Sequence, residues 1–555
     1  MRNIKQYRMK KYAIALAAAL FLAVGGKKAE ACTDLVVGKK ASVDGSVIIS
    51  YAADSHTLYG VMYRWPAATH PKGAMLDVVE WDTGKPLGRI PQVERTYSVV
   101  GNMNEHQVAI TESTFGGRHE LVDTTGIMDY GSLIYIALQR SRSAREAIKV
   151  MTDLVAAHGY YSSGESFTIA DKNEVWIMEM IGKGPGRKGA VWVAIRIPDD
   201  CISAHANQAR IHHIPFNDKE NCMYSPDIVS FAREKGYFKG ADKDFSFVNA
   251  YCPYEFGNLR GCEARVWAFF RKFCPDMDKY ETLVRGDVSK EPMPLYVRPT
   301  RKLSVQDVQN AMRDHYEGTS MDMAEEAGSG AYKVPYRWRP MNFTVDGQKY
   351  LHERAIATQQ TGFVIVPQMR NWLPDEIGGI LWFGVDDANT AVFTPVYAST
   401  LAVPECYREG NGDLLTFSWT SAFWIYNWVA NMAYHKYSFM IKDIRKVQSE
   451  LENGYRDRIP AIDKAAQALY EKNPEEARRF LTWFSTTTAE SATARWKELG
   501  EYLMVKYIDG NVKKEENGHF KRNPYGLPDA PEWPGYDEEY YRSIVKEAGD
   551  KIKAE

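Results

Sequence analysis

The sequence predicts a mixed α+β fold in which a sandwich of β-sheets is covered by helices and followed by a helical C-terminal portion. Three observations predict it. Strand-like apolar runs occur in two blocks, between residues 33 and 204 and between 354 and 394. Segments with helical periodicity flank these blocks. From Ser421 to about Lys506 the pattern is helical throughout.

Length and charge limit the remaining possibilities. A chain of 555 residues suits one large domain or two to three ordinary ones. The net charge of −2 gives no reason to expect nucleic acid or an anionic membrane surface as a partner. We expect residues 1–31 to be removed, residues 32–415 to form the core, and residues 416–555 to form a mainly helical portion packed on it.

The N-terminal segment has the pattern of a secretory signal peptide. A basic start precedes an apolar run over residues 12–24, and small residues stand at Ala29 and Ala31. Cleavage after Ala31 makes Cys32 the first residue of the mature chain. Its amine titrates at about 8 and its thiol at about 8.5, so the amine can accept the proton of the thiol. The junction predicts an exported protein, periplasmic or extracellular in a bacterium, with Cys32 as a nucleophile.

Two other interpretations of this junction remain open. A cysteine can stand at a cleavage site by coincidence, or it can be lipidated, which makes the mature chain a surface lipoprotein. Bacterial lipidation sites usually have a bulky apolar residue three positions before the cysteine, where this chain has Ala29, and Glu30 fits poorly. No later apolar run approaches the length of about 20 residues that spans a membrane, so we expect no membrane span in the mature chain.

The first elements of the mature chain read as a hairpin. Runs over 33–38 and 46–51 flank Val43-Asp44-Gly45, and Asp-Gly between apolar runs favours a hairpin turn. A two-residue loop at Asp44-Gly45 sets Asp54 opposite Leu35. Asp54 is then about three residues, roughly 10 Å, from Cys32, and a longer turn brings the two closer.

The remaining elements follow from periodicity and from turn residues. We expect further strands at 97–100, 108–112, 167–170, 175–180, 191–197, 202–204, 354–357, 362–366, 380–385 and 391–394, helices at 131–156, 262–273 and 305–316, and an irregular tail at 511–536.

Cysteine spacing excludes a common kind of metal site. The chain has seven cysteines, with no CxxC and no cysteine–histidine cluster, so we expect no metal and no cofactor. Six remain beside Cys32, an even number that allows disulfides in an exported protein. We expect structural bridges or buried thiols, with Cys252, Cys262 and Cys274 in one neighbourhood.

Amide cleavage by a thiolate needs a nucleophile, a proton acceptor and donors to the oxyanion. Cys32 supplies the first two, and Asp54 can orient its amine or the amine of a substrate. Asn104 and Asn207 carry side-chain amides that can donate to an oxyanion, and Arg265 stands on an expected helix. Taken singly, the asparagines and Asp54 read as turn residues and Arg265 as an ion-paired residue. The sequence has no phosphate-binding glycine loop, HExxH or GxSxG, which excludes NTPases, zincins and serine hydrolases of those types.

The run Cys32-Thr33-Asp34-Leu35-Val36-Val37-Gly38, continuing to Ser46, resembles the mature start of the PepD-type cysteine dipeptidases. These are N-terminal nucleophile (Ntn) hydrolases related to penicillin V acylase and conjugated bile-salt hydrolase. Further matching segments follow in order along most of the chain, at 104–105, 164–167, 205–208, 265–267, 313–319, 372–379 and 381–384.

The resemblance implies a four-layer αββα fold with Cys32 at the start of a central strand. It also implies removal of the preceding segment, by signal peptidase or by self-cleavage, and hydrolysis of dipeptides and other short peptides without a metal. Position by position, Cys32 matches the nucleophile and Asp54 the carboxylate near its amine. Asn104 matches the oxyanion-side asparagine, and Asn207 and Arg265 match polar residues around the nucleophile.

One position departs from the family pattern. Three residues before the aspartate the family usually has an arginine, whereas this chain has Tyr51. An arginine would lower the pKa of the thiol through its charge, but tyrosine offers only a hydrogen bond. Arg265 can supply the missing charge, the substrate preference can differ, or the activity can be weak or absent.

We therefore expect an exported cysteine dipeptidase whose partner is a short-peptide substrate. A homo-oligomer is compatible with the sequence. One alternative is an acylase acting on another linear amide, of the penicillin V or bile-salt type. Another is a catalytically inactive surface protein with a lipidated Cys32.

Overall fold

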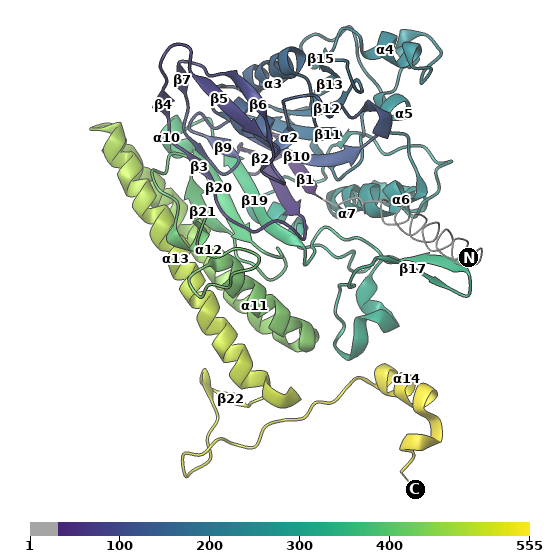
Figure 1. Ribbon diagram of the computed structural model, residues 1–555. Helices are drawn as coiled ribbons and strands as arrows, with labels where there is room; N and C mark the ends of the chain where they lie inside the picture. Colours follow the sequence, from purple (N-terminus) through teal and green to yellow (C-terminus); the bar gives the residue numbers. More distant parts are fainter. Residues whose placement is uncertain (1–31, 555) are drawn as a thin grey trace, which may run out of the picture. The chain divides into compact units, whose positions relative to one another are not determined.

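The computed structural model describes residues 32–554, so the expected signal peptide lies outside the described residues. Helices and strands mix along the described chain, and several sheets are followed by three long helices (Figure 1). The expected α+β class with a helical C-terminal portion is confirmed.

The first large sheet has seven antiparallel strands and carries the start of the described chain near its centre. Its order is β16-β14-β1-β2-β19-β20-β21. Every residue of β1 and β2 is buried, because neighbouring elements cover both faces of the sheet there. The strands are β1 (Thr33–Val37), β2 (Val47–Asp54), β14 (Ile202–His205), β16 (Tyr296–Val297), β19 (Thr361–Met369), β20 (Gly379–Val385) and β21 (Thr394–Tyr397).

The second large sheet has eight antiparallel strands in the order β15-β13-β12-β11-β10-β9-β8-β3. Its longer strands are also buried along most of their length. The strands are β3 (Arg64–Trp65), β8 (Val99–Val100), β9 (Met103–Asn104), β10 (Ala109–Gly116), β11 (Gly164–Ala170), β12 (Val175–Gly182), β13 (Ala190–Arg196) and β15 (Cys222–Tyr224).

The two sheets share one apolar cluster. Val36 and Ile49 of the seven-stranded sheet belong to the same buried cluster as Ala109 and Ile177 of the eight-stranded sheet. Strand β10 also contacts both β1 and β2. Strands β1 and β2 therefore lie next to a strand of the other sheet.

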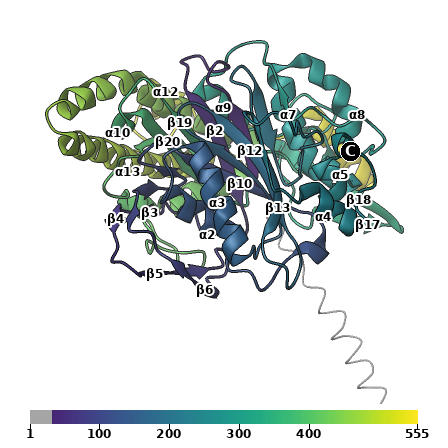
Figure 2. The same cartoon turned by 90° about the horizontal axis from the view of Figure 1, so that it is seen from above.

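Helices pack on each sheet. Helices α2 (Tyr130–Leu138) and α3 (Ala144–His158) pack on the eight-stranded sheet, and Figure 2 shows α3 along its face. The seven-stranded sheet contacts α7 (Ala264–Phe273), α9 (Val305–Ala311), α11 (Ala422–His435), α12 (Tyr437–Tyr470) and α13 (Pro474–Tyr507).

Shorter elements complete the fold. The remaining α-helices are α4 (Ile228–Glu234), α5 (Phe247–Tyr251), α6 (Phe256–Asn258), α8 (Glu281–Val284), α10 (Asp375–Gly378) and α14 (Glu538–Ala548). Small two-stranded sheets pair β4 (Ala68–Thr69) with β7 (Arg95–Thr96), β5 (Met75–Val79) with β6 (Pro86–Pro91), β17 (Asn342–Val345) with β18 (Gln348–Leu351), and β22 (Glu515–Glu516) with β23 (His519–Phe520).

The predicted two-residue hairpin between β1 and β2 is wrong. The connection covers residues 38–46, and Thr33 faces Ala52 in the observed register. The loop is longer because it bonds elsewhere: the Val43 N–H donates to the carbonyl of Leu303 at 3.0 Å. In this register Asp54 lies beyond the residue that faces Thr33, so it is next to Cys32 rather than three residues away.

Other expectations differ from the structure in length or kind. The helix expected over 131–156 is two helices, because Ser143 has an extended backbone and caps α3 by accepting from the Glu146 N–H. The helix expected over 305–316 ends at Ala311, residues 354–357 form no strand, and the strand expected over 391–394 is β21, which begins at Thr394.

The cysteines are thiols, not bridges. All seven are free, and all but the half-buried Cys262 are buried. Cys252 and Cys262 are close enough to interact electrostatically, but Cys274 interacts with Cys201 instead. The expectation of one neighbourhood for the three is therefore wrong for Cys274.

None of the helices within residues 32–554 combines the length and the apolar character that a membrane crossing requires.

Candidate active site

Cys32 directly precedes β1, and its thiol lies where the two large sheets meet. The side chain is 5 % exposed. Its Sγ lies 3.5 Å from Oε1 of Glu112 in β10 and 3.7 Å from Oη of Tyr51 in β2. Tyr51 donates to the same Glu112 oxygen at 2.7 Å. A thiol, a phenol and a carboxyl group thus form one buried cluster.

Arg265 joins the start of β1 to the loop after β14. Its Nη1 donates to the carbonyl of Cys32 at 2.6 Å and to Oγ1 of Thr33 at 2.8 Å. Its Nη2 donates to Oδ1 of Asn207 at 2.8 Å. A turn of π-helix, Leu259–Glu263, leads into α7, and Nε of Arg265 donates back to the carbonyl of Gly261 in that turn. The planar guanidinium therefore holds Cys32 and Asn207 in a fixed relation.

Asn207 is held with its amide group directed at the site. Its backbone is left-handed, with φ of 59°, a conformation that asparagine tolerates well. The backbone N–H donates to Oγ of Ser113 at 3.1 Å, and Nδ2 donates to the carbonyl of Thr114 at 2.8 Å. An amide nitrogen carries two hydrogens, so one remains for another acceptor.

Asp54 is the last residue of β2. Its carboxylate accepts from Oγ1 of Thr361 at 2.6 Å and pairs with Arg354. Burial raises the pKa of Asp54 to about 6, and the Arg354 charge opposes that rise. Asp54 also lies close to Cys32, because its charge raises the pKa of that thiol and its backbone forms a hydrogen bond with it.

The structure corrects the role expected for Asn104. Its Nδ2 donates to the carbonyls of Leu138 and Ser141, each at 2.8 Å. Its Oδ1 accepts from the N–H groups of His106 and Val108. Both hydrogens of the amide are therefore committed to the turn that Asn104 closes, and none is left for an oxyanion. The other four expected residues, Cys32, Asp54, Asn207 and Arg265, lie together.

The electrostatics of the site favour a neutral thiol. Burial raises the pKa of Cys32 well above its usual value, and the charges of Glu112 and Asp54 raise it further. Burial raises the pKa of Glu112 to about 7, although the hydrogen bond from Tyr51 opposes the rise. A positive charge beside the sulfur lowers the pKa of the thiol.

Reasoning from the sequence missed Glu112 and Arg354. A charged side chain inside an otherwise apolar strand was the available signal for Glu112, because such residues are seldom buried without a reason. Arg354 gives no such signal, because its segment has the sequence pattern of a strand.

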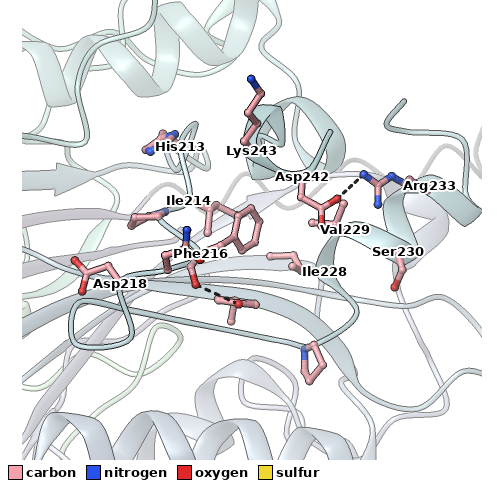
Figure 3. Close-up of a pocket in the computed structure, with 14 residues that line it drawn as sticks. His213, Ile214, Phe216, Asp218, Ile228, Val229, Ser230, Arg233, Asp242 and Lys243 are labelled. Atoms are coloured by element: carbon pink, nitrogen blue, oxygen red, sulfur yellow. Dashed lines mark hydrogen bonds and ion pairs between the residues drawn. The ribbon is translucent and has the colours of Figure 1, made fainter. Parts of the chain in front are cut away.

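A separate cleft lies away from this cluster. Its lining residues come from 213–218, Tyr224, Pro226, α4 and residues 242–243, and Cys32 and its neighbours are not among them. Arg233 and Asp242 of this lining form an ion pair, which Figure 3 marks with a dashed line. Within residues 32–554, no three His, Cys, Asp or Glu side chains are grouped as metal ligands would be.

Comparison with known proteins finds relatives that are named dipeptidases and one matching peptidase family. A "Probable dipeptidase" from Salmonella dublin is 30 % identical over 409 residues, covering 70 % of this chain and 85 % of that protein. A "Probable dipeptidase" from Latilactobacillus sakei is 28 % identical over 472 residues, covering 81 % and 90 %. "Dipeptidase A" from Lactobacillus helveticus is 24 % identical over 451 residues, covering 77 % and 85 %. The family model for peptidase family C69 matches residues 31–450. This chain therefore belongs to peptidase family C69.

Proposed function

We propose that this protein hydrolyses dipeptides and other short peptides, with Cys32 as an N-terminal nucleophile. The convergence of Asp54, Asn207 and Arg265 on Cys32 carries the proposal. Arg265 donates to the carbonyl of Cys32 and to the side chain of Asn207, and Asp54 is close enough to Cys32 for its charge to raise the pKa of the thiol. Membership of a peptidase family and the dipeptidase names of the relatives support the same reaction.

Cleavage after Ala31 gives Cys32 a free amine next to its thiol. The thiol proton moves to this amine as Sγ attacks the first carbonyl carbon of the peptide and the C–S bond forms. The resulting ammonium lowers the pKa of the thiol, against the effect of burial. Asp54 accepts a hydrogen bond from this ammonium and keeps it beside the sulfur.

The oxyanion then needs donors. Asn207 supplies the second hydrogen of Nδ2, and Arg265 fixes that amide by donating to its oxygen. Collapse of the tetrahedral species breaks the C–N bond, and the ammonium of Cys32 gives its proton to the departing amine. Water attacks the thioester, returns a proton to the amine, and releases the first product as the C–S bond breaks.

We also propose that the two large sheets and the helices on them form the four-layer αββα sandwich of Ntn hydrolases. The apolar cluster shared by the two sheets and the helices that contact each sheet support this assignment. Export is part of the proposal and rests on the signal-peptide pattern of residues 1–31. Fractionation of bacterial cells that express the full chain tests it, since we expect the protein outside the cytoplasm.

The function is tested with the mature chain, Cys32→Ser and Cys32→Ala against a panel of dipeptides. We expect turnover from the mature chain only, because neither serine nor alanine provides a thiol to the adjoining amine. Equal turnover by all three proteins excludes Cys32 as the nucleophile. Mass spectrometry of the mature N-terminus separates the lipidated alternative, because a diacylglyceryl adduct adds mass at Cys32.

A further inference from the structure

Glu112 brings a carboxylate of the eight-stranded sheet against the nucleophile of the seven-stranded sheet. The side chain is 1 % exposed. Its Oε1 is 3.5 Å from Sγ of Cys32 and accepts the hydroxyl of Tyr51. Its Oε2 is buried and receives no hydrogen bond from a nitrogen or hydroxyl of residues 32–554. The carboxyl of Glu165 lies close enough to share a proton with Glu112. A cation with N–H donors would satisfy such an oxygen far better than a second carboxyl group.

The surrounding charges leave Glu112 without a basic partner. No lysine, arginine or histidine of residues 32–554 forms an ion pair with it. The nearby guanidinium groups are engaged elsewhere: Arg265 with Cys32, Thr33 and Asn207, and Arg354 with Asp54. Tyr51, which contacts this carboxylate, donates a hydrogen bond to it and brings no charge.

Peptide geometry brings a cation to this place. The α-nitrogen of a peptide is two bonds from the first carbonyl carbon, and attack brings that carbon to about 3–3.5 Å from the sulfur. Since Oε1 of Glu112 is itself 3.5 Å from the sulfur, a peptide that presents its amino end on the Glu112 side of the sulfur brings its ammonium group within hydrogen-bonding reach of the carboxylate. A charge-assisted hydrogen bond forms there in a site shielded from water, where it is strong.

We propose that Glu112 binds the α-ammonium group of the substrate and thereby restricts hydrolysis to peptides with a free amino end. This inference rests on the proposed function. Tyr51 holds the carboxylate in place and is a positioning residue. A substrate with a blocked amine leaves Glu112 buried without its partner, so it binds poorly. This contact also separates a dipeptidase from an acylase, whose substrates carry no charge beside the scissile carbonyl.

Two other roles for Glu112 predict a different result. It could accept the proton of the thiol, or it could hold the amine of Cys32 in place of Asp54. In both cases Glu112 serves the nucleophile, so its loss should slow free and blocked substrates by the same factor. Recognition of the substrate amine instead predicts a loss confined to substrates that carry that amine.

The experiment measures kcat/KM for alanyl-alanine and for N-acetyl-alanyl-alanine with mature wild type, Glu112→Gln and the exposed control Glu498→Gln. We expect Glu112→Gln to lower kcat/KM for the free dipeptide by about 100-fold, because the change removes one partner of a buried charge pair. The same change should alter kcat/KM for the acetylated peptide by less than about threefold. The control should match wild type on both. Equal losses on the two substrates, or no loss on either, overturn the proposal.

A measurement on wild type alone covers the case in which Glu112→Gln fails to fold. Alaninamide should inhibit competitively, whereas N-acetylalaninamide should bind at least about 100-fold more weakly. Equal inhibition by the two overturns the proposal. An active Cys32→Ser variant would instead refute the proposed function, and so the two failures are distinguishable.

Discussion

Arg265 distributes its donors over the groups that make the site. Its guanidinium nitrogens donate hydrogen bonds to the carbonyl of Cys32, to Oγ1 of Thr33 and to Oδ1 of Asn207. Lysine keeps the charge but cannot donate in several fixed directions at once. We expect Arg265→Lys to lower kcat by about 10²-fold, the usual cost of disturbing an oxyanion donor, with a smaller effect on KM. Steady-state kinetics on a dipeptide check this, with the exposed Arg479→Lys as control; a kcat within threefold of wild type contradicts the role.

The buried carboxyl group of Asp386 should make the free energy of unfolding depend on pH. Asp386 follows β20, accepts from Nδ2 of Asn427 at 3.0 Å, and burial raises its pKa to about 8. In the unfolded chain the carboxyl titrates at about 3.9. Between these values the folded state binds more protons than the unfolded state, so the free energy of unfolding falls as pH rises, by up to about 1.4 kcal/mol per pH unit for this group.

Asp386→Asn removes that dependence. Asparagine is of similar size and tolerates the left-handed backbone of this position, where φ is 64°. The melting temperature of the variant relative to wild type should therefore increase steadily from pH 5 to pH 8. Thermal melts at four pH values measure it, and a difference that stays constant or decreases over this range contradicts the prediction.

Reasoning from single residues expects Cys32 and Asp54 close together, and the structure has them close together, whereas partners distant in sequence escape such reasoning. The catalytic roles of both residues stay predictions. Asn104 has the right functional group, but its local turn consumes both amide hydrogens. Glu112 meets Cys32 only because β10 of the other sheet lies against β1, which no local pattern records.

At the scale of elements, strands were easier to predict than the loops that set their register. The strand patterns of β1 and β2 are clear, but Asp44-Gly45 does not close a two-residue turn, because the loop bonds to Leu303 far along the chain. The resulting register brings Asp54 close to Cys32. Likewise, residues 354–357 have an apolar strand pattern, yet Arg354 lies in irregular chain and pairs with Asp54.

Helix α12 is joined to the core by a buried ion pair. Arg313 donates through Nη1 and Nη2 to the two carboxylate oxygens of Glu452, and the two residues are 6 % and 2 % exposed. Removing one partner leaves an unpaired buried charge, so we expect Glu452→Ala to lower the free energy of unfolding by about 3–5 kcal/mol. The double variant Arg313→Met/Glu452→Leu should recover most of that loss.

Denaturant unfolding of these variants checks the ion pair. The exposed pair of Arg495 and Glu498 is the matched control, and Glu498→Ala should change stability by less than about 1 kcal/mol. A loss for Glu452→Ala as small as that of the control, or a double variant less stable than the single one, contradicts the buried role.

At the scale of the whole molecule, the site exists only where two sheets meet. Tyr51 and Asp54 come from the seven-stranded sheet, Cys32 directly precedes its strand β1, Glu112 comes from the eight-stranded sheet, and Arg265 reaches them from α7. The α+β class and the helical C-terminal portion follow from periodicity alone. The convergence of these five residues requires the packing of the sheets, which a single sequence does not record.

The central claim is that the amine of Cys32 must be free for its thiol to cleave a peptide. The most direct measurement compares dipeptide turnover by a chain that begins at Cys32 with turnover by the same chain carrying one extra methionine ahead of it. Alkylation of Cys32 by iodoacetamide in both proteins shows that the thiol is present and accessible in each. The account predicts that the extended chain keeps less than about one hundredth of the turnover, because its backbone amide cannot accept a proton. Equal turnover by the two chains would contradict it.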